Sequence, residues 1–326
     1  MGVKIRLAAA VAVAAAVGQA FVSTAVSAQA WPQRPVRLIL PFGPASAADI
    51  AARLLGERLQ PIWGQPVVVE GKPGGDGLLS VGTMVNAKDD HILFFGPSST
   101  FVVHPYVHEN LAYDPELDLQ PIAAVATIQI AVGVPGSSGM ATLKDFVERA
   151  KANPGKLSFA VAQGFSELVF NGFVREQALQ ISKVPYRDIT TSPTDLGEGR
   201  IQLAMLSFAA LRPHAQSGRV KVVAISDNKR SAIAPEIPSV VEAGYPNLVA
   251  SPVLGMIGPR NMPIELRKRL ASDVLKVMQD KVVRERLAAT GQPASPMGVD
   301  EYAAALKGQR EQVARIAKVL GMARKK

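Results

Sequence analysis

Short apolar runs alternate with longer amphipathic segments along most of the chain. The first run, VRLIL at 36–40, is followed by a segment with a helical period at 47–60, and PVVVE at 66–70 is followed by another at 78–87. The later runs are HILFFG, IQIAVGV, KLSFAVA, KVPY, RIQLAMLS and VKVVAIS, and a pair of helices is expected from about Pro263. Buried runs rich in valine and isoleucine, each followed by a helix, predict parallel sheets with crossovers and therefore an α/β fold.

The turns and linkers between these segments are short. Asn153-Pro154-Gly155 is expected to end a helix that contains residues 146–150, because proline and glycine commonly follow the last turn. No internal repeat and no long linker is visible, so any two domains must be joined by short segments. The length of 326 residues predicts about two domains.

The first thirty residues have the composition of a secretory signal peptide. Lys4 and Arg6 precede an apolar run at 7–17, and Ala28-Gln29-Ala30 provides small residues for cleavage ahead of Trp31. An uncleaved membrane anchor is the alternative, but polar residues dilute the stretch too much for a good spanning helix. We therefore expect an exported, periplasmic protein that is cleaved after Ala30.

The charge and the cysteine count exclude several classes of function. The formal net charge is +9, and removal of Lys4 and Arg6 leaves +7, but the positive residues are dispersed and no aromatic-basic pattern suggests nucleic-acid binding. The chain contains no cysteine, which excludes disulfides, thiolate metal sites and a cysteine nucleophile.

Four loops between a predicted strand and the next helix are small, polar or rich in glycine. They are 43–46, KPGGDG at 72–77, GPSST at 96–100 and AQGFS at 162–166. Ligands of open α/β sheets bind beyond the carboxyl ends of the strands, where such loops lie. Helix N-termini offer free N–H groups and a partial positive charge, so bare loops there predict a site for a small anion.

Other interpretations compete at individual residues. Ser46 and Asp49 have the spacing of a capping box, so Asp49 either caps a helix or contacts ligand. KPGGDG matches neither nucleotide-binding glycine motif and is more typical of a turn with Asp76 near the start of a helix. His104 and His108 lack the H-E-x-x-H pattern, which favours a tight turn or helix surface over a metal site.

The order of several segments resembles a known family. WPQRPVRLILPFGPASAADIAARLL, VVVEGKPGGDGLLSVG, YDPELDLQPIA, VPYRD, LGEGRIQLAM and PEIPSVVEAGYPNL are similar, in this order, to the tripartite tricarboxylate transporter solute-binding proteins, the Bug family. The resemblance covers essentially the whole mature chain. It implies a type II periplasmic-binding-protein fold with two lobes, a ligand cleft and two crossover hinge strands. We place lobe one at 31–130 plus 252–326 and lobe two at 131–251.

The resemblance also implies a set of ligand-binding residues. Carried over by position, they are Phe42, Gly43, Ala45, Ser46, Asp49, Ser98, Ser99, Thr100, Gln163, Gly164, Phe165, Ser166, Tyr186, Arg187 and Asp188. The chain departs from the family at Ala45-Ser46 in place of Gly-Gly, in the bulkier turn at 163–166, at Asp188 in place of glycine, and in SPVLGMIGPRNMP, which lacks a tryptophan. These departures indicate a changed ligand, and a cationic or hydroxyl group opposite Asp188 is one option.

Three functions follow from these observations. The first is a monomeric receptor that captures a small carboxylate by closing its lobes and delivers it to a membrane permease, with no cofactor and no metal. The second is a ligand-binding partner of a membrane sensor, which the sequence does not separate from the first. The third is a secreted hydrolase that uses Ser166, His104 or His214 and Asp188, but no residue spacing favours it, because Ser166 lacks the second glycine of G-x-S-x-G.

Overall fold

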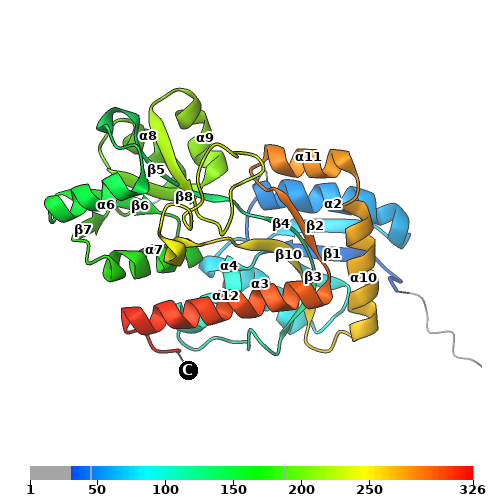
Figure 1. Ribbon diagram of the computed structural model, residues 1–326. Helices are drawn as coiled ribbons and strands as arrows, with labels where there is room; N and C mark the ends of the chain where they lie inside the picture. The colour runs from blue at the N-terminus through cyan, green and yellow to red at the C-terminus, as the bar shows by residue number, and fades with distance from the viewer. Residues whose placement is uncertain (1–30, 45, 187, 326) are drawn as a thin grey trace, which may run out of the picture. The chain divides into compact units, whose positions relative to one another are not determined.

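The computed structural model describes residues 31–44, 46–186 and 188–325. Arg34–Lys326 forms one compact unit (Figure 1). Residues 31–33 belong to a separate unit and contain a cis peptide bond between Trp31 and Pro32. The predicted signal peptide and its cleavage position lie outside the described residues.

The larger sheet has six strands, in the order β11-β4-β10-β3-β1-β2. In chain order they are β1 (Val36–Leu40), β2 (Val67–Gly71), β3 (Ile92–Pro97), β4 (Leu119–Thr127), β10 (Val253–Pro259) and β11 (Ala294–Met297). β1 pairs in parallel with both β2 and β3, whereas β10 runs antiparallel to both β3 and β4. The carboxyl ends of β1, β2 and β3 therefore meet at one edge of this sheet.

The smaller sheet repeats the same plan with five strands, in the order β7-β6-β8-β5-β9. In chain order they are β5 (Ile130–Pro135), β6 (Leu157–Val161), β7 (Ile181–Lys183), β8 (Leu203–Ser207) and β9 (Val220–Ile225). β6 pairs in parallel with β7 and β8, and β5 runs antiparallel to β8 and β9. β10 in the larger sheet and β5 in the smaller sheet each follow a crossover, and each lies between two strands to which it is antiparallel.

The chain crosses between the sheets twice. Ile128 and Gln129 join β4 to β5, and residues 226–252 lead from β9 back to β10. The crossovers are bonded together, since Ile128 N–H donates to the Pro252 carbonyl (2.8 Å) and Ser226 N–H donates to the Ile130 carbonyl (2.8 Å). This mixed α/β arrangement of two sheets joined by two crossovers confirms the predicted fold class.

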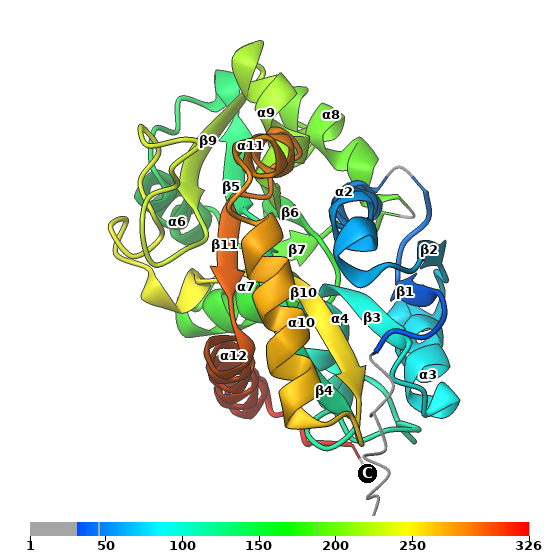
Figure 2. The ribbon, with the colours of Figure 1, turned by 90° about the vertical axis from the view of Figure 1, so that its right-hand side faces the viewer.

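Helices cover both sheets (Figures 1 and 2). Around the six-stranded sheet they are α2 (Ala47–Trp63), α3 (Leu78–Ala87), α4 (Ser99–Val102), α5 (His104–Val107), α10 (Ile264–Val277), α11 (Lys281–Ala289) and α12 (Val299–Leu320). Around the other they are α6 (Leu143–Ala152), α7 (Phe165–Glu176), α8 (Ser192–Gly197) and α9 (Phe208–Gln216). The 3₁₀ turns are η1 (Gly75–Gly77), η2 (Gly136–Ser138), η3 (Ile189–Thr191) and η4 (Pro246–Leu248).

One helix pair connects the two halves of this unit. α12 packs against both β4 and α7, and α7 also packs against α4. A Cβ at Gly172 on α7 would lie 2.9 Å from Ile316 Cγ2 on α12, so the helices approach closely at this glycine. The apolar core accordingly runs from Phe94 in β3 of the first sheet to Phe170 on α7, beside the second sheet.

One predicted helix end is confirmed, and three local predictions are wrong. The strand predicted at KVPY (183–186) is displaced, because β7 spans Ile181–Lys183. α6 ends at Ala152, directly before Asn153-Pro154-Gly155, as predicted. The expectation of purely parallel sheets is wrong because β5 and β10 are antiparallel. The carboxy-terminal pair of helices is in fact three helices and the strand β11, because a short apolar segment at 294–297 pairs with β4. Among the described residues, no helix is long and apolar enough to cross a bilayer.

Candidate functional site

The loops that follow β1, β2 and β3 form one continuous patch. A Cβ at Gly77 would lie 2.1 Å from Thr100 Cγ2 and 3.5 Å from Pro41 Cβ, so these three loops touch. Gly77 also has φ +92°, a conformation that favours glycine. The glycine-rich turn at 72–77 therefore supports the other two loops through close packing, and its structure as a 3₁₀ turn before α3 confirms the predicted turn.

Ser98 fixes the loop after β3 to the start of β10, directly after the second crossover. Its backbone N–H donates to the Val253 carbonyl (2.8 Å), and its Oγ accepts a hydrogen bond from Val253 N–H (3.0 Å). Ser98 is fully buried. Of the three predicted ligand residues here, Thr100 is also buried and Ser99 is partly exposed.

The loop after β6 meets this patch from the second sheet. Gly164 has φ +81° and ψ −129°, and a Cβ there would lie 3.9 Å from the Ser99 carbonyl oxygen. Gln163 beside it is exposed. Two loops that are predicted to bind ligand, one from each sheet, therefore lie next to each other.

The first turn of α7 supplies backbone groups to the same place. Phe165 is fully buried in the apolar core and Ser166 is 5% exposed, so the Phe165 side chain is not available to a ligand. The first N–H groups of a helix have no partner within the helix, and they carry the positive end of its dipole. The turn at 164–166 thus offers amides rather than side chains to an anion.

A pocket of about 300 Å³ opens beside Gln163 on the second sheet. Tyr186 lines it and donates its hydroxyl to Asp195 Oδ2 (2.8 Å), and Arg200 also donates to Asp195 (2.8 Å). Burial, together with the hydrogen bond to the Asp195 carboxylate, raises the pKa of the Tyr186 phenol to about 12. Tyr186 is therefore a neutral, oriented wall of this pocket.

Two charged residues of the pocket already have partners. Asp188 accepts hydrogen bonds from Thr190 N–H (2.9 Å) and Thr190 Oγ1 (2.7 Å), which hold its pKa below the usual value. Lys183 pairs with Glu167 on α7. Asp188 thus caps η3, while its exposed carboxylate still borders the pocket.

The start of α2 supports the capping interpretation for Ser46. Ser46 Oγ accepts from Asp49 N–H at 3.2 Å. Asp49 is 4% exposed, and its carboxylate is held by Arg53 at 3.0–3.1 Å. Phe42 is 39% exposed and Gly43 is partly exposed at the same loop. The predicted residues Ala45 and Arg187 lie outside the described residues.

His104 is part of the support for the glycine-rich turn. Its Nε2–H donates to the Asp76 carbonyl (3.0 Å), while Nδ1 accepts from the Tyr113 hydroxyl (2.5 Å). Burial lowers the pKa of His104 to about 4, so the ring is neutral. His108 Nε2 lies 3.7 Å from Asp76 Oδ2, and a metal bound by these three residues would have to displace the bonds of His104. The same bonds leave His104 unsuited to activate Ser166.

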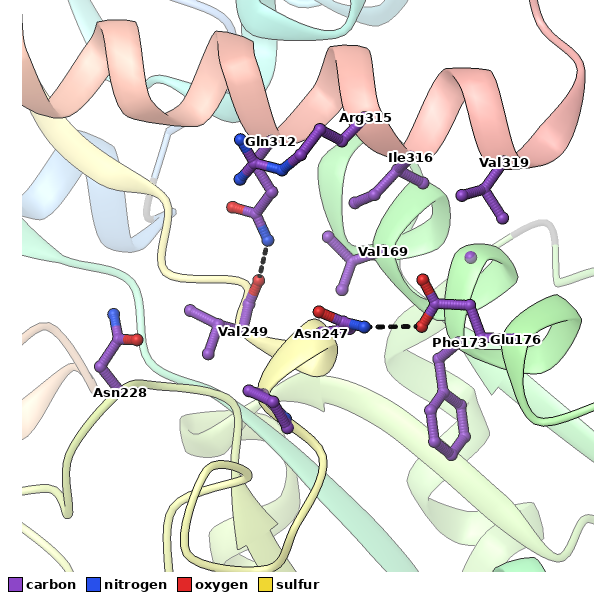
Figure 3. A pocket seen from close by; sticks show the side chains of 12 residues that line it. Val169, Phe173, Glu176, Asn228, Asn247, Val249, Gln312, Arg315, Ile316 and Val319 are labelled. Atoms are coloured by element: carbon purple, nitrogen blue, oxygen red, sulfur yellow. Dashed lines mark hydrogen bonds between the residues drawn. The ribbon is translucent and has the colours of Figure 1, made fainter.

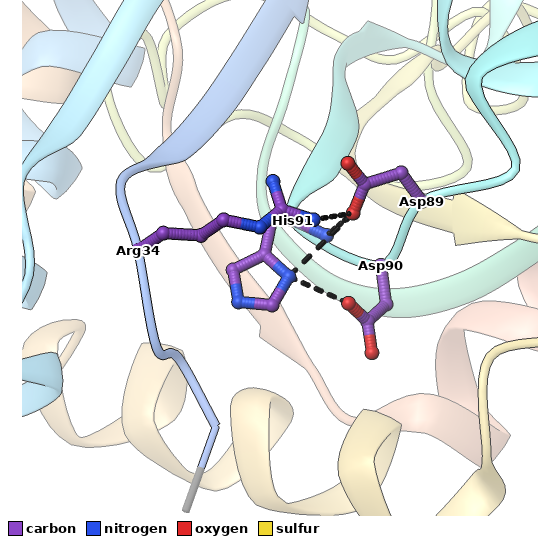
Figure 4. A network of polar contacts seen from close by, with 4 residues as sticks. All are labelled: Arg34, Asp89, Asp90 and His91. Atoms are coloured by element: carbon purple, nitrogen blue, oxygen red, sulfur yellow. Dashed lines mark hydrogen bonds and ion pairs between the residues drawn. The ribbon is translucent and has the colours of Figure 1, made fainter.

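A second histidine cluster lies at the opposite ends of the strands (Figure 4). Asp89 accepts hydrogen bonds from Arg34 (2.7 Å) and from His91 N–H (2.9 Å), and His91 Nδ1 lies 2.6 Å from Asp90 Oδ1. Burial acts to raise the pKa of Asp89, but these hydrogen bonds outweigh it and hold the pKa below its usual value. The cluster ties residues before β1 to residues before β3 and does not contribute to the loop patch.

The structure also brings residues to the site that the sequence analysis missed. Lys183 borders the pocket and pairs with Glu167, 16 positions earlier in the chain. Asp195 supports the pocket by accepting a hydrogen bond from Tyr186, 9 positions earlier. Lys183 lies at the end of the short strand β7. The sequence analysis chose its other ligand loops at the same kind of position, directly after a predicted strand. Asp195 gives no local signal, because its role depends on how α8 folds back on Tyr186.

A family model supplies the deciding comparison. The model described as the tripartite tricarboxylate transporter family receptor matches residues 51–322. The chain belongs to this family. Its receptors are substrate-binding proteins and not enzymes, which removes the hydrolase interpretation.

Individual relatives agree with this assignment. A UPF0065 protein of Bordetella bronchiseptica is 29% identical, and the alignment covers 88% of this chain and 85% of that protein. The solved periplasmic binding protein BugD is 25% identical with a TM-score of 0.74, over 91% of this chain and 100% of its own. Two Rhodopseudomonas palustris structures, Rpa4515 with adipate and MatC with bound malate, are each 23% identical and share the fold, with TM-scores of 0.77 and 0.70 over 90% and 89% of this chain and 99% of each of those chains.

Proposed function

We propose that this protein is a periplasmic receptor that captures a small carboxylate between its two sheets and delivers it to a tripartite tricarboxylate-type permease. The observation that carries the proposal is the meeting of the loop at Ser98–Thr100 with the loop at Gln163–Gly164. These loops come from different sheets, so a ligand bound to both would link the two halves of the fold.

The chemistry of the loops supports an anionic ligand. The residues at which these loops touch, Pro41, Gly77 and Thr100, are themselves uncharged, and the first turn of α7 adds free amides. Backbone N–H groups at a helix start bind carboxylates through hydrogen bonds and through the helix dipole. The adipate and malate in the two related folds support a dicarboxylate as the first class to test.

Closure is the mechanism that the crossovers support. We assign lobe one to 31–130 plus 252–326 and lobe two to 131–251, with hinges at the bonded crossover segments. Ser98 contacts Val253 directly after the second crossover, so the ligand loop and the hinge move together. A ligand that contacts both lobes has a higher affinity for the closed form and shifts the population towards it.

Export and delivery complete the proposal. The signal peptide at 1–30, with cleavage after Ala30, directs the chain to the periplasm, where the relative BugD functions as a periplasmic binding protein. The receptor then acts as a monomer and presents its closed form to the permease.

A thermal-shift screen tests the ligand class. The mature protein, refolded once to remove carried-over ligand, is mixed with acetate, succinate, malate, adipate, citrate, benzoate and amino acids. A true ligand at a hundredfold excess over its dissociation constant stabilises the fold by about 2.7 kcal/mol. This corresponds to a rise in Tm of roughly 5 °C or more for a chain of this size.

Variants then test the site. Gln163→Ala is expected to weaken binding about tenfold through the loss of about 1.4 kcal/mol. Gln180→Ala, which changes an exposed glutamine before β7, is the matched control and should bind as the wild type does. The absence of a shift with every acid, or equal binding by the two variants, would contradict the proposed function.

A further inference from the structure

A second pocket lies away from the loop patch, at the junction of α7 and α12 (Figure 3). Its volume is about 460 Å³, and its lining comes from both helices, from η4 and from the second crossover. The close approach at Gly172 and Ile316 closes one wall. No part of the loop patch lines it, so it is separate from the proposed carboxylate site.

The floor and walls of this pocket are apolar. Val169 and Phe173 are buried on α7, and Ile316 is 9% exposed on α12. Val319 at the rim is 38% exposed. An alkyl chain of a few carbons would cover these surfaces, and burial of each CH₂ group would favour binding.

The rim carries one cation and one anion that do not pair with each other. Arg315 and Glu176 are both exposed, and neither forms an ion pair with a residue that the structure describes. Glu176 accepts a hydrogen bond from Asn247 Nδ2 (2.9 Å). Figure 3 shows the Arg315 guanidinium beside Gln312 and the Glu176 carboxylate on the other side of the pocket, beside Asn247.

Neutral polar groups complete the rim. Gln312 donates to the Val249 carbonyl at 2.6 Å, which fixes its amide at the Arg315 end. Asn228 lies on the rim and is exposed. A ligand with a single charge would meet one matching and one repelling group, whereas a ligand with both charges would match both ends.

We propose that the α7–α12 pocket binds a small zwitterion, with a carboxylate on Arg315, an ammonium group on Glu176 and a short alkyl chain between them. The pocket spans helices from both halves of the fold. A ligand bound there therefore changes the relative free energies of any two arrangements of α7 and α12. By linkage, it also changes the affinity of the loop patch for the carboxylate.

Calorimetry with three matched probes tests the site. 4-Aminobutanoate carries both charges, butanoate lacks the ammonium group, and butylammonium lacks the carboxylate. We expect 4-aminobutanoate to bind with a dissociation constant of about 1 mM or below, and each singly charged probe to bind at least tenfold more weakly. Arg315→Gln and Glu176→Gln change exposed side chains, so both variants should fold.

The variants separate this pocket from the carboxylate site. Either substitution should weaken 4-aminobutanoate binding about tenfold, and Glu176→Gln should improve butanoate binding because it removes the repelling carboxylate. Lys318→Gln, an exposed cation on the same helix but outside the pocket, and Gln163→Ala in the loop patch should leave 4-aminobutanoate binding unchanged. The proposal is overturned if wild type fails to bind 4-aminobutanoate, or if its binding is lost in Gln163→Ala and retained in Arg315→Gln and Glu176→Gln.

Discussion

The two sides of the candidate carboxylate site differ in how they are built. The first-sheet side, made of the loops at 41–46, 72–77 and 97–100, is held by buried and specific contacts such as Ser98 with Val253 and His104 with Asp76. The second-sheet side, at 162–166, 183–186 and 188–191, carries exposed polar and charged groups around a pocket, among them Gln163 and Lys183. We propose that the first-sheet side fixes the position of the ligand, and that the second-sheet side selects which ligand is bound.

The largest predicted effect comes from Gly77 on the first-sheet side. Gly77→Ala places a Cβ 2.1 Å from Thr100 Cγ2 at a φ of +92°, so it adds a steric clash to backbone strain. We expect the free energy of unfolding to fall by about 3 kcal/mol in urea titration, from overpacking and left-handed strain together. Gly75→Ala in the same turn, with φ +56° and no contact closer than 3.4 Å, should lose only about 1 kcal/mol. Equal losses in the two variants would show that the loops are not packed as described.

His104 predicts a pH dependence of similar size. Its pKa is about 4 in the folded protein and 6.5 ordinarily, so between these values the unfolded chain binds more protons. Stability should therefore fall as the pH is lowered from about 6.5 to 4, by up to about 3 kcal/mol from this residue. Urea unfolding across this range should show a shallower decline in His104→Gln than in the wild type. Parallel declines would mean that His104 is not buried in its neutral form.

Ser98 predicts a smaller loss on the same side. Ser98→Ala leaves the buried Val253 N–H without its hydroxyl acceptor, and we expect a loss of about 1–3 kcal/mol of unfolding free energy. Ser99→Ala, which changes a partly exposed neighbour, should lose less than about 0.5 kcal/mol. A small effect of both substitutions in thermal and urea unfolding would remove Ser98 as the link between loop and hinge.

On the second-sheet side, the expected effect on stability is the smallest. Lys183→Gln breaks an ion pair with Glu167 in which the side chains are 35% and 26% exposed, and surface pairs contribute only about 0–1 kcal/mol. Because Lys183 lines the pocket, the affinity for a carboxylate should nevertheless fall several-fold. Lys144→Gln, which breaks the exposed pair with Glu148 on α6, should leave affinity unchanged. If Lys183→Gln destabilises the fold strongly and leaves affinity unchanged, the assignment of roles to the two sides fails.

The same contrast explains what could be predicted from the sequence. Strands, most helices and the bare loops follow from local period and from glycine and serine content, and those predictions agree with the structure at β1, α3 and α6. The contacts that define the site are not local. Ser98 depends on Val253, 155 residues later, and His104 depends on Asp76, 28 residues earlier.

The direction of β5 and β10 could not be predicted for a related reason. Their apolar runs have the same pattern as those of the parallel strands. Each of them is antiparallel because the chain enters it from a crossover between the sheets. The hydrophobic period of a strand does not show what kind of connection precedes it. The resemblance to a family supplied the two crossovers, which the residue pattern alone did not predict.

The central claim is that a bound carboxylate draws together the loops at Ser98–Thr100 and Gln163–Gly164. Because the chain has no cysteine, Ser99→Cys with Gln163→Cys gives a background-free pair for measuring the rate of cross-linking by a short bifunctional maleimide. With the carboxylate identified in the thermal-shift screen, the account predicts faster cross-linking with saturating ligand than without it, and no change with a non-binding acid. A ligand that binds this double variant and leaves the cross-linking rate unchanged would contradict the account.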